Sequence, residues 1–362
     1  MKETSLSVLL ATNRQPNSYT ADLARSLAPH CQLTMGTDNF WLCLRRHDIV
    51  HFHWPEELFS WRNVTRQGLI DLRALLEGFY SDCKIVVTMH NVQPHYGDNP
   101  LFDDLYKLLF GFAHAVIHFG NASIQLYQEL YSDVPRFQPK PLDHRMIPHQ
   151  SYQQLLARIP KESARKSMGI SEDRKLMVVF GSIRHEEEET LILDAFRAAK
   201  VPQKSLLVSN WKYFYKARRR HNPLLKIFYK LREVQWRRSQ YAVFHHGLVS
   251  EDDIANYLQA ADIVFIPRKK VLNSGILPLA FTFGKVVVGP DTGNVGEWLR
   301  NTGNPVFDPH SICSLGQAVE SAYALADGGL GKKNARLALS DWLPENIAKQ
   351  HMLLYEELVS RA

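Results

Sequence analysis

Residues 262–299 read DIVFIPRKKVLNSGILPLAFTFGKVVVGPDTGNVGEWL and contain two short β-branched runs, each followed by a stretch with helical spacing of its apolar residues. The runs at 262–266 and 286–288 are apolar on both faces, which is typical of strands buried in a parallel sheet. The stretches at 276–283 and 295–299 are the helices that follow them. A strand, a helix, a strand and a helix in this order predict a parallel sheet covered by helices.

The same alternation extends through most of the chain. In the first half we expect strands at 6–11, 48–51, 84–88, 115–118 and 146–148 and helices at 20–27, 65–79, 101–112 and 123–131. After a polar stretch at 151–173, the second series adds strands at 176–180, 205–208 and 242–245 and helices at 188–200 and 252–260. We therefore predict an α/β protein with two doubly wound, Rossmann-like domains facing each other across a cleft. The expected boundaries are 1–155, 172–340 and, for a C-terminal helix that can cross back to the first domain, 341–362.

The composition is that of a globular protein of 362 residues, 45% hydrophobic and 22% charged. At roughly 100–200 residues per domain, this length predicts two domains with separate cores. No apolar run reaches the roughly 18–20 residues that a membrane-spanning helix needs. The short apolar run near the N-terminus is interpreted as the first strand and not as a secretion signal. Four cysteines are scattered without metal-binding spacing, which indicates a reducing cytoplasm and no structural metal.

Most of the excess positive charge lies in one segment, 211–239. The chain has 43 lysines and arginines against 37 acidic residues, and this segment alone has ten basic residues against one acid. Aromatic residues are interleaved with the basic ones, a combination that suits an anionic membrane surface. The residues assigned to this membrane patch are Lys216, Arg218, Arg219, Arg220 and Lys230. The alternatives are a solvated pair of basic helices and a nucleic-acid-binding module; the latter leaves the motifs below unexplained, so no nucleic-acid partner is expected.

Doubly wound sheets bind ligands beyond the carboxyl ends of their strands, so chemistry is expected in the loops there. In the first half, Asn17 lies in the polar loop after the first strand. His51 and His53 at the end of the next strand point the same way, but no third metal ligand is visible. We therefore favour the interpretation that these histidines form a polar wall of an acceptor pocket, in which Trp54 stacks on a sugar ring.

Four further residues of the first half are candidates for catalysis. Glu56 and Glu57 are the nearest carboxylates able to act as a general base. His90 follows the strand at 84–88 and is expected at the floor of the cleft, the alternative being an ordinary buried histidine. Asp98 lies in the loop that follows.

The second half has an arginine and a helix start that suit phosphate. After the strand at 176–180, the sequence GSIR ends in Arg184, and a glycine followed by an arginine can bring backbone and guanidinium against a diphosphate. Asn273 and Ser274 can cap the helix at 276–283, whose free N–H groups favour an anion. Three basic residues beside that helix would add positive charge: Arg268, Lys269 and Lys270.

The order HFHWPE, TMHN, FGSIR and VLNSGILPLAFTFGKVVVGPDTGNVGEWL resembles GT-B fold glycosyltransferases of the family-four branch, in particular bacterial exopolysaccharide transferases of the xanthan-type mannosyl kind. The resemblance covers nearly the whole chain. It implies that the second domain holds a nucleotide-diphospho-sugar, that the first holds the acceptor, and that neither a metal nor another cofactor is required.

The resemblance also implies roles for single residues. His90 matches a histidine that contacts the donor sugar near the reacting carbon, and Arg184 matches the basic residue that holds the diphosphate. The donor-binding helix start corresponds to Asn273, Ser274 and Gly275, the glycine that closes the helix to Gly284, and a later glutamate to Glu297.

Two features depart from the family pattern. The two glutamates usually found around the donor-binding helix are replaced by Val271 and Leu279, and glutamates at 186–189 stand where a lysine usually follows Arg184. The stereochemical outcome stays open: inversion would need Glu56, Glu57 or Asp98 as base, whereas retention would use His90 at the sugar.

These features together predict a cytoplasmic hexosyltransferase, bound peripherally to the inner face of the plasma membrane, that acts in polysaccharide biosynthesis. The donor would be a GDP- or UDP-linked sugar. The acceptor would be a saccharide or a polyprenyl-diphosphate-linked saccharide. The rival hypotheses are a catalytically inactive partner subunit, a nucleotide-sugar epimerase and a nucleic-acid-binding module.

Overall fold

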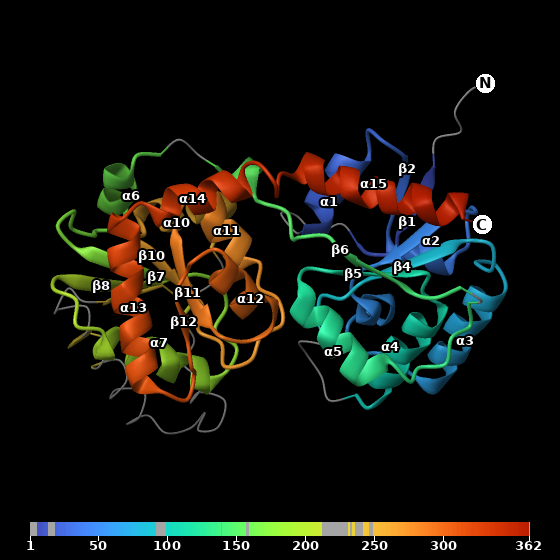
Figure 1. The fold of residues 1–362 in the computed structure, drawn as a ribbon, viewed down its shortest axis with the longest axis horizontal. Helices are drawn as coiled ribbons and strands as arrows, with labels where there is room; N and C mark the ends of the chain where they lie inside the picture. Colours follow the sequence, from blue (N-terminus) through green and yellow to red (C-terminus); the bar gives the residue numbers. More distant parts are fainter. Residues whose placement is uncertain are drawn as a thin grey trace. The chain divides into compact units, whose positions relative to one another are not determined.

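The computed structural model describes residues 6–13, 19–91, 99–138, 140–156, 159–211, 231, 234, 235, 242–245 and 249–361. The chain divides into two compact units, unit 1 with residues 1–150 and 342–362 and unit 2 with residues 151–341. Each unit is a six-stranded parallel sheet with helices around it, so the predicted α/β architecture with two parallel sheets is confirmed (Figure 1).

Unit 1 is built on a sheet in the order β2-β1-β3-β4-β5-β6, all of whose neighbours are parallel. Its strands are β1 (Ser7–Leu10), β2 (Gln32–Met35), β3 (Ile49–Phe52), β4 (Lys84–Thr88), β5 (Ala115–His118) and β6 (Asp143–Met146). Its helices are α1 (Tyr19–Leu27), α2 (Thr37–Trp41), the 3-10 helix η1 (Pro55–Phe59), α3 (Arg66–Glu77), α4 (Leu101–Phe112), α5 (Asn121–Tyr131) and α15 (Pro344–Ser360). The strand order reverses between β1 and β3, which is where doubly wound sheets bind ligands.

The last helix of the chain belongs to unit 1. Helix α15 lies beside α1, although the two are separated by more than three hundred residues (Figure 1). Its apolar face, with Ile347, Leu354 and Tyr355 fully buried, joins the core formed by β1, β3 and β5. The core of unit 1 therefore depends on both ends of the chain.

Unit 2 has a sheet in the order β12-β11-β10-β7-β8-β9, again parallel throughout. Its strands are β7 (Lys175–Val179), β8 (Lys204–Val208), β9 (Ala242–Phe244), β10 (Ile263–Phe265), β11 (Val286–Pro290) and β12 (Val306–Phe307). Its helices are η2 (Gln153–Leu155), α6 (Lys161–Ser167), α7 (Glu186–Ala198), α10 (Glu251–Ala260), α11 (Ile276–Thr282), α12 (Gly293–Asn301), α13 (Ile312–Asp327) and α14 (Leu330–Ala338). Here the order reverses between β7 and β10.

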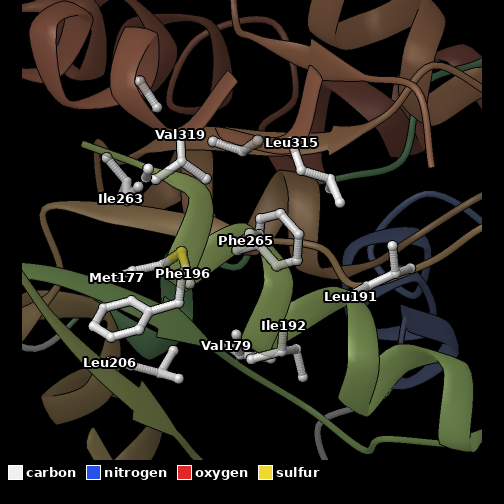
Figure 2. Packing of buried hydrophobic residues seen from close by; sticks show 14 of the residues in the cluster. Met177, Val179, Leu191, Ile192, Phe196, Leu206, Ile263, Phe265, Leu315 and Val319 are labelled. Atoms are coloured by element: carbon white, nitrogen blue, oxygen red, sulfur yellow. The ribbon is translucent and has the colours of Figure 1, made fainter. Parts of the chain in front are cut away.

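The core of unit 2 lies between its sheet and two helices that are far apart in the sequence, α7 and α13. Met177 and Phe265 of the sheet pack with Ile192 of α7 and with Leu315 and Val319 of α13, all of them at most 2% exposed (Figure 2). Strand β10 is apolar at every position, and β7 is apolar and buried after Lys175, as the sequence pattern predicted.

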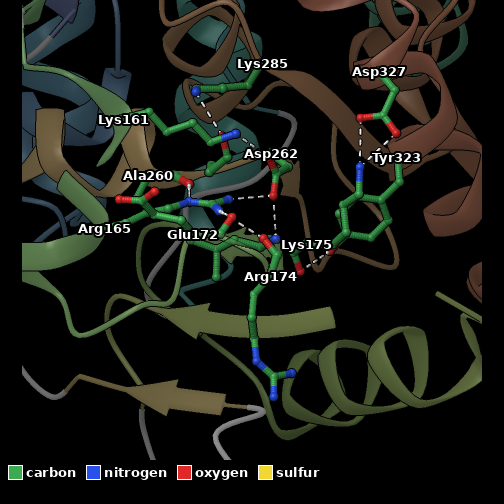
Figure 3. A network of polar contacts seen from close by, with 12 residues as sticks. Lys161, Arg165, Glu172, Arg174, Lys175, Ala260, Asp262, Lys285, Tyr323 and Asp327 are labelled. Atoms are coloured by element: carbon green, nitrogen blue, oxygen red, sulfur yellow. Dashed lines mark hydrogen bonds and ion pairs between the residues drawn. The ribbon is translucent and has the colours of Figure 1, made fainter. Parts of the chain in front are cut away.

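The polar stretch at 151–173, expected between the two halves, belongs to unit 2 and carries helix α6, which a buried ion pair joins to the residue before β10. The guanidinium of Arg165, 3% exposed, contacts the Asp262 carboxylate at 2.7 Å. It also donates to three backbone carbonyl oxygens, those of Ala260, Glu172 and Arg174 (Figure 3). Burial by itself would raise the pKa of Asp262, but its hydrogen bonds and the neighbouring cations hold that pKa below its ordinary value.

Some elements differ from the sequence predictions. The strand expected at 146–148 lies earlier, at Asp143–Met146, and strand β2 was not foreseen. β2 is an edge strand with two polar residues and partly exposed side chains, so it lacks the continuous apolar run of the central strands.

Candidate functional sites at the carboxyl ends of the sheets

In unit 1, Glu57 fastens the loop after β1 to the segment after β3. One carboxylate oxygen accepts a hydrogen bond from the Thr12 hydroxyl, and the other accepts from the Asn13 backbone N–H at 3.0 Å. The residue is 4% exposed, and burial raises the pKa of its carboxyl despite these two hydrogen bonds. Because both of its carboxylate oxygens accept hydrogen bonds, Glu57 holds the loop after β1 in position.

Glu56 lies in the first turn of η1, next to Glu57 in the sequence. It is fully buried and accepts a hydrogen bond from the Tyr106 hydroxyl at 3.0 Å. Burial raises the pKa of its carboxyl above the ordinary value, so the proton is held more tightly than on an exposed glutamate.

Three of the residues predicted from sequence come together at the ends of β3 and β4. His53 Nδ1 and His90 Nε2 are 3.1 Å apart, and the ring of Trp54 stacks on His90 with centroids 4.1 Å apart. The rings of Tyr19 and Phe119 each form a T-shaped pair with the same imidazole, with centroids 5.1 Å apart. His90 is 7% exposed, so its ring is held by neighbours on several sides.

A third histidine, His51, is fully buried next to His53, with ring centroids 4.2 Å apart. Both ring nitrogens of His51 are engaged, Nδ1 with the Tyr355 hydroxyl at 2.7 Å and Nε2 with the Thr88 hydroxyl at 2.8 Å. Burial, followed by the proximity of other histidines, lowers the pKa of His51 and His53 well below the ordinary value, so both are neutral at pH 7. Within the described ranges, no group of three or more His, Cys, Asp or Glu side chains is arranged to hold a metal ion.

Sequence analysis missed Tyr19, Tyr355 and His351 as neighbours of these histidines. Tyr355 and His351 lie on α15, some three hundred residues after β3, and only the packing of α15 on unit 1 brings them near. A signal was present in the helical spacing of the two residues, which places them on one face of α15.

In unit 2, the residues after β7 and β10 meet where the strand order reverses. Gly181, with φ +92°, donates its backbone N–H to Ser209 Oγ at 3.0 Å. Arg268 donates from Nη2 to the Ser182 carbonyl oxygen at 2.9 Å and forms an ion pair with Glu188 at 2.5 Å. Arg184 is placed beside this pair, because its backbone N–H also donates to Glu188.

The expected excess of positive charge beside helix α11 requires correction. Arg268 is paired with Glu188, and Lys269 lies 3.0 Å from the Glu187 carboxylate. The glutamates that replace the family's lysine therefore neutralise two of the cations that were expected to act on an anion.

The prediction that Asn273 and Ser274 cap helix α11 is wrong. Gly275 occupies the N-cap position, and no side chain in the described part of unit 2 caps the helix. Asn273 instead accepts a hydrogen bond from the Asn294 side chain at 2.7 Å, which fastens its loop to the start of α12. Glu297 lies one turn further along the same helix and is partly exposed.

The positions of the two absent family glutamates are apolar in the structure as well. Val271 is partly buried in the loop before α11, and Leu279 on α11 is 6% exposed. The backbone of Val271 lies so close to Gly293 that a Cβ added to Gly293 would overlap the Val271 carbonyl oxygen.

Several predicted residues lie outside the described residues. These are Asn17, Asp98 and the membrane-patch residues Lys216, Arg218, Arg219, Arg220 and Lys230. None of the described helices is long and apolar enough to cross a membrane.

Two doubly wound parallel sheets, one in each unit, are the architecture of GT-B fold proteins. Solved structures agree with this class. Sucrose-phosphate synthase from Thermosynechococcus elongatus is similar with a TM-score of 0.68, at 16% identity over 98% of this chain and 99% of that one. HepE from Anabaena, solved with UDP and glucose, is similar with a TM-score of 0.67, at 12% identity over 97% and 99%.

No family model matches the chain. Among curated proteins, it is similar to the GDP-mannose:glycolipid 4-beta-D-mannosyltransferase of Xanthomonas campestris pv. campestris, with 22% identity over 252 residues. The match covers 68% of this chain and 62% of that enzyme, so it spans less than two thirds of the relative's length.

Proposed function

We propose that this protein is a glycosyltransferase that moves a hexose from a GDP- or UDP-linked donor to a glycolipid or saccharide acceptor in polysaccharide biosynthesis. The observation that carries the proposal is the similarity to a GDP-mannose-dependent glycolipid mannosyltransferase over 68% of the chain. The GT-B fold supports it, because similar structures include one solved with UDP-glucose.

Unit 2 is the proposed donor-binding domain. The loop that ends in Arg184 follows β7 at the reversal of the strand order, where doubly wound sheets bind ligands. An arginine at this place can bind a diphosphate through two parallel N–H groups. The further donor-binding residues proposed are Lys269, Asn273, Ser274, Gly275 and Glu297.

Unit 1 is the proposed acceptor-binding domain. The ring of Trp54 is partly exposed while its other contacts hold it against His90, which suits stacking on a sugar. His53 and Asn17 are the proposed polar contacts beside it.

In the proposed reaction the acceptor hydroxyl oxygen bonds to the anomeric carbon, and the bond from that carbon to the donor phosphate breaks. Arg184 stabilises the negative charge that develops on the leaving diphosphate. The acceptor proton passes to a base, for which Glu56 and Asp98 are proposed in preference to Glu57, whose two oxygens are engaged. His90 is proposed to contact the donor sugar, and the reaction is proposed to need no metal.

Nucleotide binding and turnover test this function directly. Thermal unfolding of the purified protein is measured with GDP, UDP, ADP and their sugars in EDTA, since a ligand at about 100 times its Kd adds about 2.7 kcal/mol. We expect one nucleotide to stabilise the protein and the Arg184→Ala variant to lose that response. Arg197→Ala, which removes a half-exposed arginine of α7, is the matched control. Stabilisation by none of these ligands would contradict the proposal.

A second candidate is a GT-B subunit without catalytic activity, which the apolar residues Val271 and Leu279 favour. Such a subunit would bind a nucleotide without transferring sugar. Transfer of radiolabelled mannose or glucose to a glycolipid by the isolated chain decides between the two.

Peripheral membrane binding through Lys216, Arg218, Arg219, Arg220 and Lys230 is part of the same proposal. Each basic residue near an anionic surface contributes about 1 kcal/mol. We expect the protein to float with vesicles containing phosphatidylglycerol and to remain in solution with pure phosphatidylcholine. Equal recovery with both kinds of vesicle would contradict membrane binding through this segment.

A further inference from the structure

The loop at 181–184 of unit 2 is held in place from two neighbouring strand ends. Ser209, directly after β8, accepts a hydrogen bond from the Gly181 backbone N–H at 3.0 Å. Arg268, after β10, donates to the Ser182 carbonyl oxygen at 2.9 Å. The backbone that leads to Arg184 is therefore fixed before any ligand binds.

Glu188 connects this loop to Arg268. Its Oε2 atom lies 2.5 Å from Arg268 Nη1 and accepts the Arg184 backbone N–H at 2.6 Å. One carboxylate oxygen thus holds both the arginine that fastens the loop and the main chain of the arginine proposed to bind diphosphate. Glu188 lies in the first turn of α7, so the helix itself carries the contact.

The pair is buried, whereas the neighbouring pair is not. The side chains of Arg268 and Glu188 are 11% and 5% exposed, and those of Lys269 and Glu187 are 37% and 63% exposed. A buried charge left without its partner is strongly unfavourable, while an exposed pair contributes little. Loss of either member of the buried pair should therefore displace the loop, and loss of the exposed pair should not.

The charges also restrict what Arg268 can do. Its guanidinium is committed to Glu188 and to a backbone carbonyl oxygen. Arg268 is therefore not available as a second cation for a ligand unless its ion pair with Glu188 breaks.

We propose that Glu188 and Arg268 are positioning residues, which fix the loop at 181–184 so that Arg184 meets the diphosphate of the donor. This proposal rests on the proposed function of unit 2. On this proposal, unit 2 distinguishes a nucleoside diphosphate from a monophosphate through a buried ion pair that does not itself contact the ligand.

The test compares the affinities for nucleoside diphosphates with those for the matching monophosphates by titration calorimetry. GDP and GMP, and UDP and UMP, are titrated into the wild type, Glu188→Gln and Arg268→Met. We expect both variants to lose at least tenfold in diphosphate affinity and less than twofold in monophosphate affinity. Glu187→Gln removes the carboxylate of the exposed pair and should leave both affinities unchanged. Equal losses for diphosphate and monophosphate, or no loss in folded variants, would overturn the proposal.

A second measurement separates this proposal from the proposed function. Hydrogen–deuterium exchange of a peptide covering 181–186 is followed in the full chain without ligand. We expect faster exchange there in Glu188→Gln than in Glu187→Gln, with unit 1 unchanged. If the wild type binds no nucleotide, the proposed function fails, and unaltered exchange of this peptide would in addition refute the positioning role.

Discussion

Acid should unfold unit 1 before unit 2, because unit 1 buries neutral histidines. Every described histidine whose pKa folding lowers lies in unit 1. His118 and His351 are fully buried, and burial lowers their pKa to about 3 and about 4. Such a histidine is protonated in the unfolded chain at a pH where the folded chain keeps it neutral, so stability falls as the pH falls below about 6.5.

The size of the effect follows from proton linkage. Each of these two histidines is fully stabilising above its unfolded pKa and loses about 1.4 kcal/mol per pH unit until its folded pKa is reached. Between pH 7.5 and 5.5 the two together cost about 3 kcal/mol. Burial also lowers the pKa of His51 and His53, so their contribution to stability falls with pH in the same direction. The loss is a large part of the roughly 5–15 kcal/mol that stabilises a domain.

Urea unfolding at pH 7.5, 6.5 and 5.5, with hydrogen exchange to resolve the two units, measures this effect. We expect unit 1 to lose protection at lower urea as the pH falls. His351→Phe should reduce the pH dependence of its stability by one proton, or about 1.4 kcal/mol per pH unit near pH 5.5. His30→Gln changes an exposed histidine of unit 1 and is the control. A His351→Phe variant with the pH dependence of the wild type would refute the reasoning.

Three further predictions concern single contacts. Arg165→Met should lower the free energy of unfolding of unit 2 by about 3 kcal/mol in urea titrations, because Asp262 and three carbonyl oxygens lose a buried partner; an unchanged urea midpoint would contradict this. Gly293→Ala should lower the free energy of unfolding by about 2 kcal/mol or more in thermal unfolding, because a Cβ at this position meets backbone atoms. Gly303→Ala, also at positive φ but with open space around it, should lower it by about 1 kcal/mol. Equal losses of stability in the two variants would contradict the overlap at Gly293. Glu57→Gln should keep turnover within about tenfold of the wild type if the residue positions its loops, whereas loss of a general base costs about 10²–10⁴-fold.

The order of elements was predictable because it is encoded locally. Largely apolar runs such as those at 84–88 and 115–118 mark strands buried on both faces, and β4 and β5 begin and end at those residues. The edge strand β2 was not predicted, because a partly exposed edge strand needs no such apolar run. The alternation of strands and helices then required parallel sheets, whose carboxyl ends hold the candidate residues.

The partners of those residues were decided by the tertiary structure. His53 meets His90 because β3 pairs with β4, and Glu188 meets Arg268 because β7 pairs with β10, which is far away in the sequence. The capping role expected of Asn273 failed for the same reason, since Asn294 of α12 competes for its side chain. A sequence states which groups can donate, accept or carry charge. Which of them are buried together, and hence which charges are neutralised, depends on strand order and on the return of α15 to unit 1.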